Sequence, residues 1–443
     1  MAAPDAGPPP GRSLWDRLFR RGDRSAPLPP ERHNERVLYA EVFFQSIAGA
    51  GALSFLAVFL VRLGAPNWLV GLHTSLPALV TILAILPVGA FVRRQRNLVR
   101  VVNVARLIYR SAVASFGLLV YLPAAVAPFL LVAVESLVAI PGAALNVAST
   151  TILGRATTPR RRPSMLSTRM AVHGLMGSAV GLLAGLWLDR VVYPLNYQLL
   201  FLSALLAGLG SIAMLSRLKL PTISPEQAAA RARVGVGVGQ VLALVRATPL
   251  FRDFAIAAFI FRIGQDLPMA LYAIYRVRTL GASDAWIGAL LTIQRFLSVF
   301  VYIILSRVLS KTRSRSILWV SCLGIALFPL AMALARTPEQ LVISAILGGL
   351  FAPGVDIFMT NTLFQVSTEE ERPSFVAANT LLANVTAFAA PLLGTLLADL
   401  TFIRLALYVA TGLRMLGGLA FWRLNVGAEQ PAPSPEQPDA PPA

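Results

Sequence analysis

The sequence predicts an all-α membrane protein in which twelve transmembrane helices form two six-helix, pseudo-symmetric bundles. Three observations support this prediction: the composition, the number of long apolar segments, and a repeat between the two halves of the chain. The 443 residues are 56% hydrophobic and only 14% charged, with a mean hydropathy of +0.67. A soluble protein of this size would need more charge to cover its surface, so the composition indicates a membrane protein.

Apolar segments long enough to cross a hydrocarbon core of about 30 Å as helices recur along the chain. We expect twelve of them, at 38–62, 68–91, 101–121, 126–152, 164–188, 196–216, 249–275, 284–308, 316–335, 339–365, 373–398 and 402–424.

The distribution of Lys and Arg predicts the orientation of these helices. Basic residues are concentrated in the connections on one side, including RRQRNLVR at 93–100 and SKTRSR at 310–315, and are sparse on the other side. Because cytoplasmic loops carry more positive charge, we expect a multi-pass protein of the plasma membrane with both termini in the cytoplasm. The same distribution explains the net charge of +18 through contact with anionic lipid of the bilayer, without nucleic acid.

Five parts follow along the chain. We expect a disordered cytoplasmic tail at 1–36, in which SLWDRLFRR is either an interfacial helix or part of a disordered basic tail. Residues 37–216 and 249–425 form the two bundles. A central cytoplasmic loop at 217–248 contains SPEQAAARA, a pattern that favours a short helix. Residues 426–443 form a second disordered tail.

Two stretches of 28 residues show the internal repeat. RPSMLSTRMAVHGLMGSAVGLLAGLWLD begins at Arg162, and RPSFVAANTLLANVTAFAAPLLGTLLAD begins at Arg372. The Pro-Gly pair at 141–142 likewise corresponds to the pair at 353–354. Because these pairs keep their order and spacing, we expect a duplication, with a solute site where the two halves meet near the middle of the membrane.

With these features the sequence resembles the major facilitator superfamily over about residues 37–425. Besides the repeat, the resemblance rests on GAFVRRQRN at 89–97, ATPLFRDF at 247–254 and AAPLLGT at 389–395. It implies secondary active transport by alternating access, in which Gly89, Arg93 and Arg94 belong to a gating loop. It also implies that the first, fourth, seventh and tenth helices line the cavity, with the second, fifth, eighth and eleventh beside them.

The chain departs from the patterns of this family at several positions. Arg93 and Arg96 stand where the loop signature has Asp and Gly, and Leu182 stands where the antiporter signature has Pro. The glycines at 177, 181 and 185 resemble that antiporter pattern, but small residues at this spacing also serve close packing between helices. Antiport is therefore a hypothesis that rests on the helix patterns. Export of an amphipathic or organic-anion solute is a hypothesis that rests on these patterns and on the arginines expected in the cavity.

Charged and amide side chains inside the predicted helices are the candidate site residues, because a charge at mid-membrane costs about 3 kcal/mol on insertion scales. The candidates for solute binding or proton coupling are Asp266, Arg262, Glu135, Arg295, Asp356, Gln265 and Gln294. A carboxylate in a low-dielectric cavity can carry a proton, and Asp266 is the first choice. Arg262 either binds an anionic group or neutralises Asp266 as an i, i+4 pair.

Other buried charges receive less weight. Arg106, Arg110 and Arg414 lie in helices that the resemblance places outside or behind the cavity, and Glu41, Arg169 and His173 are further candidates.

The chain lacks a phosphate-binding G-x-x-x-x-G-K-[ST] loop, so a gradient must supply the energy, and we expect protons to be the coupling ion. An enzyme is not expected, because the chain lacks H-E-x-x-H and has only three His. We expect no metal and no cofactor, a monomer, and a small-molecule solute as partner. The alternative is a transport-inactive membrane receptor or scaffold on the same fold.

Overall fold

The structure is a computed structural model that describes residues 30–158, 161–220, 248–308, 314–367 and 372–424. Within these ranges every regular element is a helix, and twelve helical segments are long and apolar enough to cross a membrane. The predicted all-α fold with twelve membrane helices is therefore confirmed. The predicted interfacial helix, the short helix of the central loop and the disordered tail at 426–443 lie outside the described residues.

The first six segments form the N-terminal half. They are α2 (Pro30–Ala50) continued by η1 (Ala52–Phe55) and α3 (Leu56–Arg62), α4 (Asn67–Arg94), α5 (Leu98–Ser115) with η2 (Phe116–Tyr121), α6 (Ala127–Arg155), α7 (Arg162–Arg190) and α8 (Leu195–Leu215).

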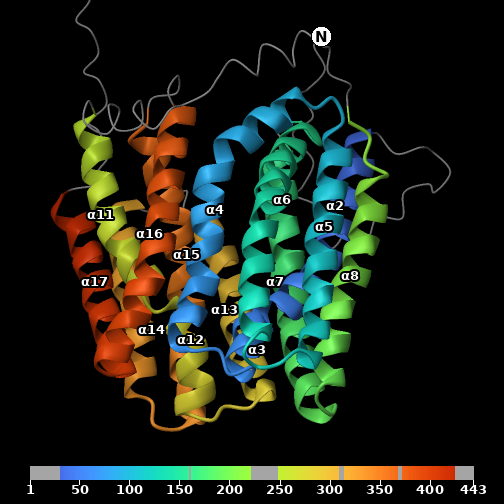
Figure 1. The fold of residues 1–443 in the computed structure, drawn as a ribbon. Coiled ribbons are helices and arrows are strands. Elements are labelled where there is room, and N and C mark those ends of the chain that lie inside the picture. The colour runs from blue at the N-terminus through green and yellow to red at the C-terminus, as the bar shows by residue number, and fades with distance from the viewer. Residues whose placement is uncertain (1–29, 159–160, 221–247, 309–313, 368–371, 425–443) are drawn as a thin grey trace, which may run out of the picture.

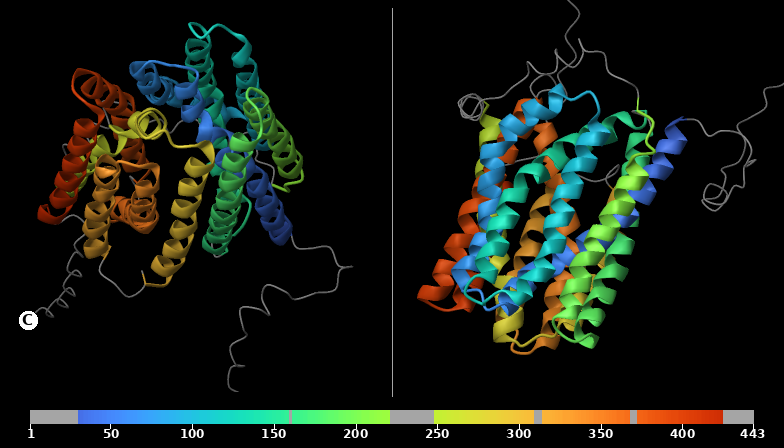
Figure 2. Two further views of the ribbon diagram at one scale, coloured as in Figure 1. Left: turned by 90° about the horizontal axis from the view of Figure 1, so that it is seen from below. Right: turned by 45° about the vertical axis from the view of Figure 1, so that its right-hand side comes forward.

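The other six segments form the C-terminal half. They are α11 (Pro249–Asp266) continued by α12 (Met269–Ile274) and η3 (Tyr275–Thr279), α13 (Asp284–Val308), α14 (Ser314–Leu334), η4 (Pro338–Gln340) with α15 (Leu341–Gln365), α16 (Arg372–Leu400) and α17 (Ile403–Arg423). Figures 1 and 2 show the two halves side by side, coloured blue to green and yellow to red.

The first membrane helix begins at Pro30, earlier than the predicted boundary at 37. Its first turns are polar, which is why hydropathy assigned them to the tail. They are held by specific contacts instead. Asn34 donates a hydrogen bond to the carbonyl of Lys219 (2.8 Å), and Glu35 forms an ion pair with Arg161 (2.9 Å).

The helix contacts repeat between the two halves. In the N-terminal half α2 packs against α7 and α8, α5 against α6 and α8, and α4 against α6. The equivalent helices of the C-terminal half make the corresponding contacts: α11 with α16 and α17, α14 with α15 and α17, and α13 with α15. This correspondence explains why the chain repeats itself, since each half builds the same bundle.

The helices that carry the Arg-Pro-Ser repeat join the two halves. The helix α7 packs along α13, and α16 packs along α4. At one point α7 and α13 approach so closely that a Cβ on Gly185 would lie 3.0 Å from the Cα of Gly288. The lack of side chains at these two glycines lets the backbones meet, so at Gly185 the packing interpretation of the glycine pattern holds.

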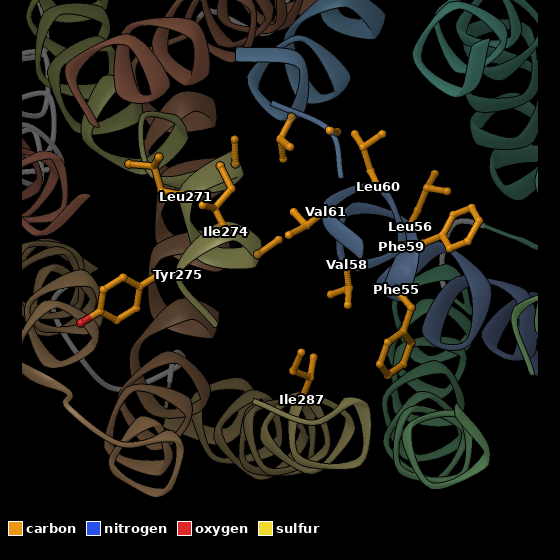
Figure 3. Close-up of a cluster of buried hydrophobic side chains, with 14 of the residues drawn as sticks. Phe55, Leu56, Val58, Phe59, Leu60, Val61, Leu271, Ile274, Tyr275 and Ile287 are labelled. Carbon is orange, nitrogen blue, oxygen red and sulfur yellow. The ribbon is translucent and has the colours of Figure 1, made fainter. Parts of the chain in front are cut away.

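We call the end of the bundle where α2 begins and α17 ends the terminal face, and the opposite end the far face. An even number of crossings places both ends of the described chain on the terminal face. The largest buried apolar cluster contains residues from both halves. Figure 3 shows its part near the far face, where Val58 and Val61 of α3 lie across from Leu271 and Ile274 of α12. This cluster joins the halves toward the far face.

Candidate functional site

Polar contacts reinforce the apolar cluster at the far face. Arg62 at the end of α3 forms an ion pair with Asp284 at the start of α13, with Nη2 and Oδ1 2.8 Å apart. The hydroxyl of Tyr197 donates to the other oxygen of Asp284 (3.0 Å), and the backbone N–H of Asp284 donates to Asp189 (2.9 Å). Asp284 from the C-terminal half is thus bound by three residues of the N-terminal half.

A second group of contacts lies beside the first. Arg278, at the end of the seventh crossing, donates to the side chain of Asn67 (2.6 Å) and to the carbonyl of Ala65. Asn67 donates in turn to Asp399 of α16 (2.6 Å). Together these two groups seal the far face by linking the first helices of the N-terminal half to the C-terminal half.

Deeper in the membrane, Arg295 connects the two halves. It projects from α13 and donates to the carbonyl of Gly177 in α7 (3.2 Å) and to the hydroxyl of Ser54 in η1 (2.8 Å). Thr292, one turn earlier, donates to the carbonyl of Ser178 (2.9 Å). Arg295 was predicted as a cavity residue, and the structure places it at the boundary between the halves, where its acceptors are neutral.

The polar contacts recorded between the two halves therefore lie at the far face and near the middle of the bundle. In the part of the chain that the structure describes, none is recorded near the terminal face. This distribution is that of a two-bundle protein closed at its far face.

A cavity of about 270 Å³ lies within the C-terminal half. It is lined from α11 to α15 and from α17. Its polar residues are Gln265, Tyr272, Arg276, Gln294, Asp356 and Arg414. Three of the predicted site residues, Gln265, Gln294 and Asp356, thus come together in one cavity.

Two arginines give this cavity a positive character. Arg414 is 4% exposed and donates to the carbonyls of Gly264 (3.1 Å) and Ile325 (2.9 Å) and to the hydroxyl of Tyr272 (3.1 Å). All of these acceptors are neutral. The buried Nε of Arg276 has no hydrogen-bond partner among the described residues.

One carboxylate lines the same cavity. Asp356 accepts a hydrogen bond from the hydroxyl of Tyr302 (2.9 Å). The cavity lining therefore carries two positive charges against one negative charge, an arrangement suited to a solute with an anionic group.

Asp266 and Arg262 do not form a direct ion pair, although their i, i+4 spacing would allow one. Asp266 accepts a hydrogen bond from the hydroxyl of Thr386 in α16 (2.7 Å), and Arg262 donates to Asn379 of the same helix (3.5 Å). Both residues therefore connect α11 to α16. Asp266 is also the last residue of α11, at the point where the seventh crossing breaks before α12.

Glu135 lies in the N-terminal half, away from the C-terminal cavity. It is hydrogen-bonded to His73, which is 8% exposed, and this pair joins α6 to α4. His73 was not among the residues predicted from the sequence. The signal that could have identified it was a titratable side chain inside an apolar segment.

The three gating-loop candidates lie on the last turns of α4. Gly89 and Arg93 are within the helix, and Arg94 is its last residue. The Nε of Arg93 is buried without a hydrogen-bond partner among the described residues, and the side chain of Arg94 is exposed. No carboxylate of the described chain forms a recorded ion pair with either arginine.

Three charged residues of the N-terminal half form an ion triad. Glu41 of α2 is 1% exposed and pairs with Arg106 of α5 and Arg169 of α7, both at 2.7 Å. Gln45 and Ser211 donate further hydrogen bonds to the same carboxylate. The resemblance had placed the helix of Arg106 behind the cavity. The signal that could have identified the triad was the presence of three charged residues in three separate apolar segments.

The chain is similar to known proteins in sequence profile and in fold. A family profile described as Major Facilitator Superfamily matches residues 38–340 and 254–442. No curated protein sequence matches the chain.

Several solved structures are similar in fold. A nucleoside transporter has a TM-score of 0.65 at 13% identity, covering 88% of this chain and 99% of that chain. A human organic anion transporter has a TM-score of 0.62 at 15% identity, covering 89% and 100%. A D-xylose–proton symporter has a TM-score of 0.67 at 13% identity, covering 89% and 97%.

Proposed function

This chain belongs to the major facilitator superfamily, and we propose that it is a proton-coupled secondary transporter for a small solute with an anionic group. The observation that carries the solute class is the cavity of the C-terminal half. It has two arginines and one carboxylate in its lining, and the guanidinium of Arg414 contacts only neutral acceptors. A guanidinium whose recorded hydrogen-bond acceptors are all neutral can bind a carboxylate or phosphate.

The contacts at the far face support alternating access as the mechanism. In this mechanism the contacts belong to the end state in which the far face is closed. To complete a cycle, the ion pair of Arg62 and Asp284 and the hydrogen bonds of Arg278 must break while new contacts form at the terminal face. The positive charge of the loops at the terminal face supports the assignment of this face to the cytoplasmic side of the plasma membrane.

Asp266 is our candidate for proton coupling. It lies where α11 breaks, it accepts a hydrogen bond from α16, and the charges of Arg262 and Arg414 act on it. A proton on this carboxylate would remove the negative charge that both arginines experience. The contacts between α11 and α16 and the charge balance of the cavity would then change together.

Proton antiport is the coupling mode to test first, because the helix patterns of α7 and α16 resemble those of antiporters. One of the similar structures, by contrast, is described as a proton symporter. The direction of solute movement relative to an imposed pH gradient distinguishes antiport from symport.

The test is a flux assay in proteoliposomes with a pH gradient across the membrane. Candidate solutes are first selected by thermal shift, comparing carboxylates and phosphates with cationic and neutral compounds of similar size. We expect an anionic solute to bind and to move in proportion to the pH gradient. Binding without flux would favour the transport-inactive receptor, and selection of a cationic solute would contradict the proposed solute class.

The residues for the matching binding test are Arg414 and Asp253. Arg414→Gln is expected to weaken binding of the anionic solute, because it removes one of the two positive charges of the cavity. Asp253→Asn, at a partly exposed position on α11 outside the cavity lining, is the control. Equal affinity of the Arg414 variant and the wild type would remove this arginine from the solute site.

A further inference from the structure

A groove on the N-terminal half lies apart from the contacts and cavity described above. Its volume is about 1420 Å³, and its lining comes from α4, α5, α6 and the α4–α5 connection. The helix α6 forms its floor, because α6 packs against both α4 and α5, whereas α4 and α5 have few direct contacts with each other. Figure 1 shows the end of α4 turning toward α5 at the terminal face, where Gln95, Arg96 and Asn97 of the connection contribute to the lining.

The walls of the groove are apolar and exposed. Leu83 of α4 is 70% exposed, Leu137 of α6 is 67% exposed, and Val104 and Ile108 of α5 are each about half exposed. In a membrane protein such side chains face hydrocarbon. Their arrangement in a groove, instead of on a flat surface, matches the shape of acyl chains.

The length of the groove matches one leaflet of a bilayer. Along α4 the lining extends from Val80 to Arg94. At 1.5 Å per residue this part of the helix is about 21 Å long, which covers the hydrocarbon half-thickness of about 15 Å and part of the headgroup region. A phospholipid with its headgroup at the terminal face would therefore fit along the groove.

Three arginines line the end of the groove at the terminal face. Arg94, Arg96 and Arg100 are exposed, and the residues that line the groove include no carboxylate. None of the three takes part in an ion pair recorded for the described chain. Guanidinium groups bind phosphate through charge-assisted hydrogen bonds, and arginines near the cytoplasmic surface attract anionic lipid.

We propose that this groove is a specific binding site for one anionic phospholipid of the inner leaflet. The acyl chains lie between α4, α5 and α6, and the phosphate of the headgroup contacts Arg94, Arg96 and Arg100. General attraction of a basic loop to a membrane requires no groove, whereas this site combines an apolar groove of one leaflet's length with cations at its end. The proposal does not depend on the identity of the solute or on proton coupling.

The experiment measures phospholipid binding to the purified full chain by native mass spectrometry, with phosphatidylglycerol and phosphatidylcholine as probes. Wild-type protein is expected to bind one phosphatidylglycerol much more tightly than phosphatidylcholine. The triple variant Arg94→Gln, Arg96→Gln, Arg100→Gln is expected to lose on the order of 100-fold in affinity, because each arginine near an anionic surface contributes about a factor of five.

Two controls separate the groove from general surface charge. The variant Arg217→Gln, Arg252→Gln, Arg423→Gln removes three exposed charges from the same face outside the groove lining. It is expected to retain most of the affinity.

Ile108→Trp fills the groove without changing any charge, and it is expected to weaken binding of phosphatidylglycerol. Leu202→Trp, at an exposed position of α8 outside the groove, is its control.

Three results would overturn the proposal. The first is an equal loss of affinity in the two triple variants, since surface charge alone would then explain the binding. The second is binding of phosphatidylcholine as tight as that of phosphatidylglycerol. The third is unchanged binding in Ile108→Trp, a variant that keeps all arginines and so remains informative if the triple variant fails to fold.

Discussion

Replacement of Asp284 by Asn is expected to release the seal at the far face. The carboxylate is 6% exposed, and it accepts hydrogen bonds from Arg62 (2.8 Å) and Tyr197 (3.0 Å) that join the two halves. Asparagine keeps the shape but removes the charge. The substitution therefore weakens contacts that exist only while the far face is closed.

The size of this effect follows from the burial of the two partners. A hydrogen bond to a charged group contributes about 1.5–3 kcal/mol when buried. The side chain of Arg62 is 35% exposed, so water partly compensates for the lost ion pair, and the lower part of that range applies. A loss of about 2 kcal/mol shifts the equilibrium between the two end states roughly 30-fold toward the state that is open at the far face.

Pulsed electron–electron double resonance, which measures the distance between two spin labels, would detect this shift. The labels are placed at exposed positions of the two halves, Val192→Cys and Thr401→Cys, in a background where the buried Cys322 is replaced by Ala. We expect a second, longer distance to appear in the Asp284→Asn variant.

The control is Glu339→Gln, which removes an exposed carboxylate near the far face. A distance distribution in Asp284→Asn identical to that of the wild type would refute the assignment of Asp284 to the seal. The same change in the Glu339 variant would show that the effect is one of surface charge.

Three further substitutions test other parts of the structure. Asp266→Asn is expected to abolish proton-linked flux, measured with a pH-sensitive dye in proteoliposomes, while Asp253→Asn preserves it; unchanged flux in the first variant would remove Asp266 from coupling. Glu41→Gln is expected to lower the free energy of unfolding by about 3–5 kcal/mol, because the buried Arg106 and the partly buried Arg169 both lose their carboxylate, and a negligible change in thermal unfolding would contradict this. Gly264→Ala places a Cβ 2.7 Å from the backbone of α17 and is expected to destabilise the protein by about 1–3 kcal/mol, whereas Gly412→Ala, where nothing lies within 4 Å, should not.

The membrane helices could be predicted because hydropathy over a long segment depends little on tertiary contacts. The start of the first helix at Pro30 could not be predicted in this way. Its first turns are polar. Asn34 and Glu35 hold them in place by contacts with loop residues that lie more than a hundred positions further along the chain. The equivalence of α7 and α16 was readable because duplication left both Arg-Pro-Ser segments at the same length.

The site residues were harder to predict, because each helix offers several faces and several partners. The i, i+4 spacing of Arg262 and Asp266 suggested an ion pair within α11. Asp266 instead accepts a hydrogen bond from Thr386 of α16, and spacing within one helix gives no information on such a contact. Arg414 was expected to face away from the cavity, and the structure places it in the cavity lining. Contacts between distant segments decide such cases, and a single sequence records them only as isolated charges in apolar segments.

Solute flux through a protein whose far face is held shut tests alternating access most directly. In the Cys322→Ala background, Arg62→Cys and Asp284→Cys are joined by a short, cleavable bis-thiol linker, and the protein is reconstituted in proteoliposomes with a solute identified by thermal shift. The linked protein is expected to bind the solute from the terminal face but to show no flux, and cleavage of the linker is expected to restore flux. Transport at an unchanged rate with the linker in place would contradict a mechanism in which the two halves must separate at the far face.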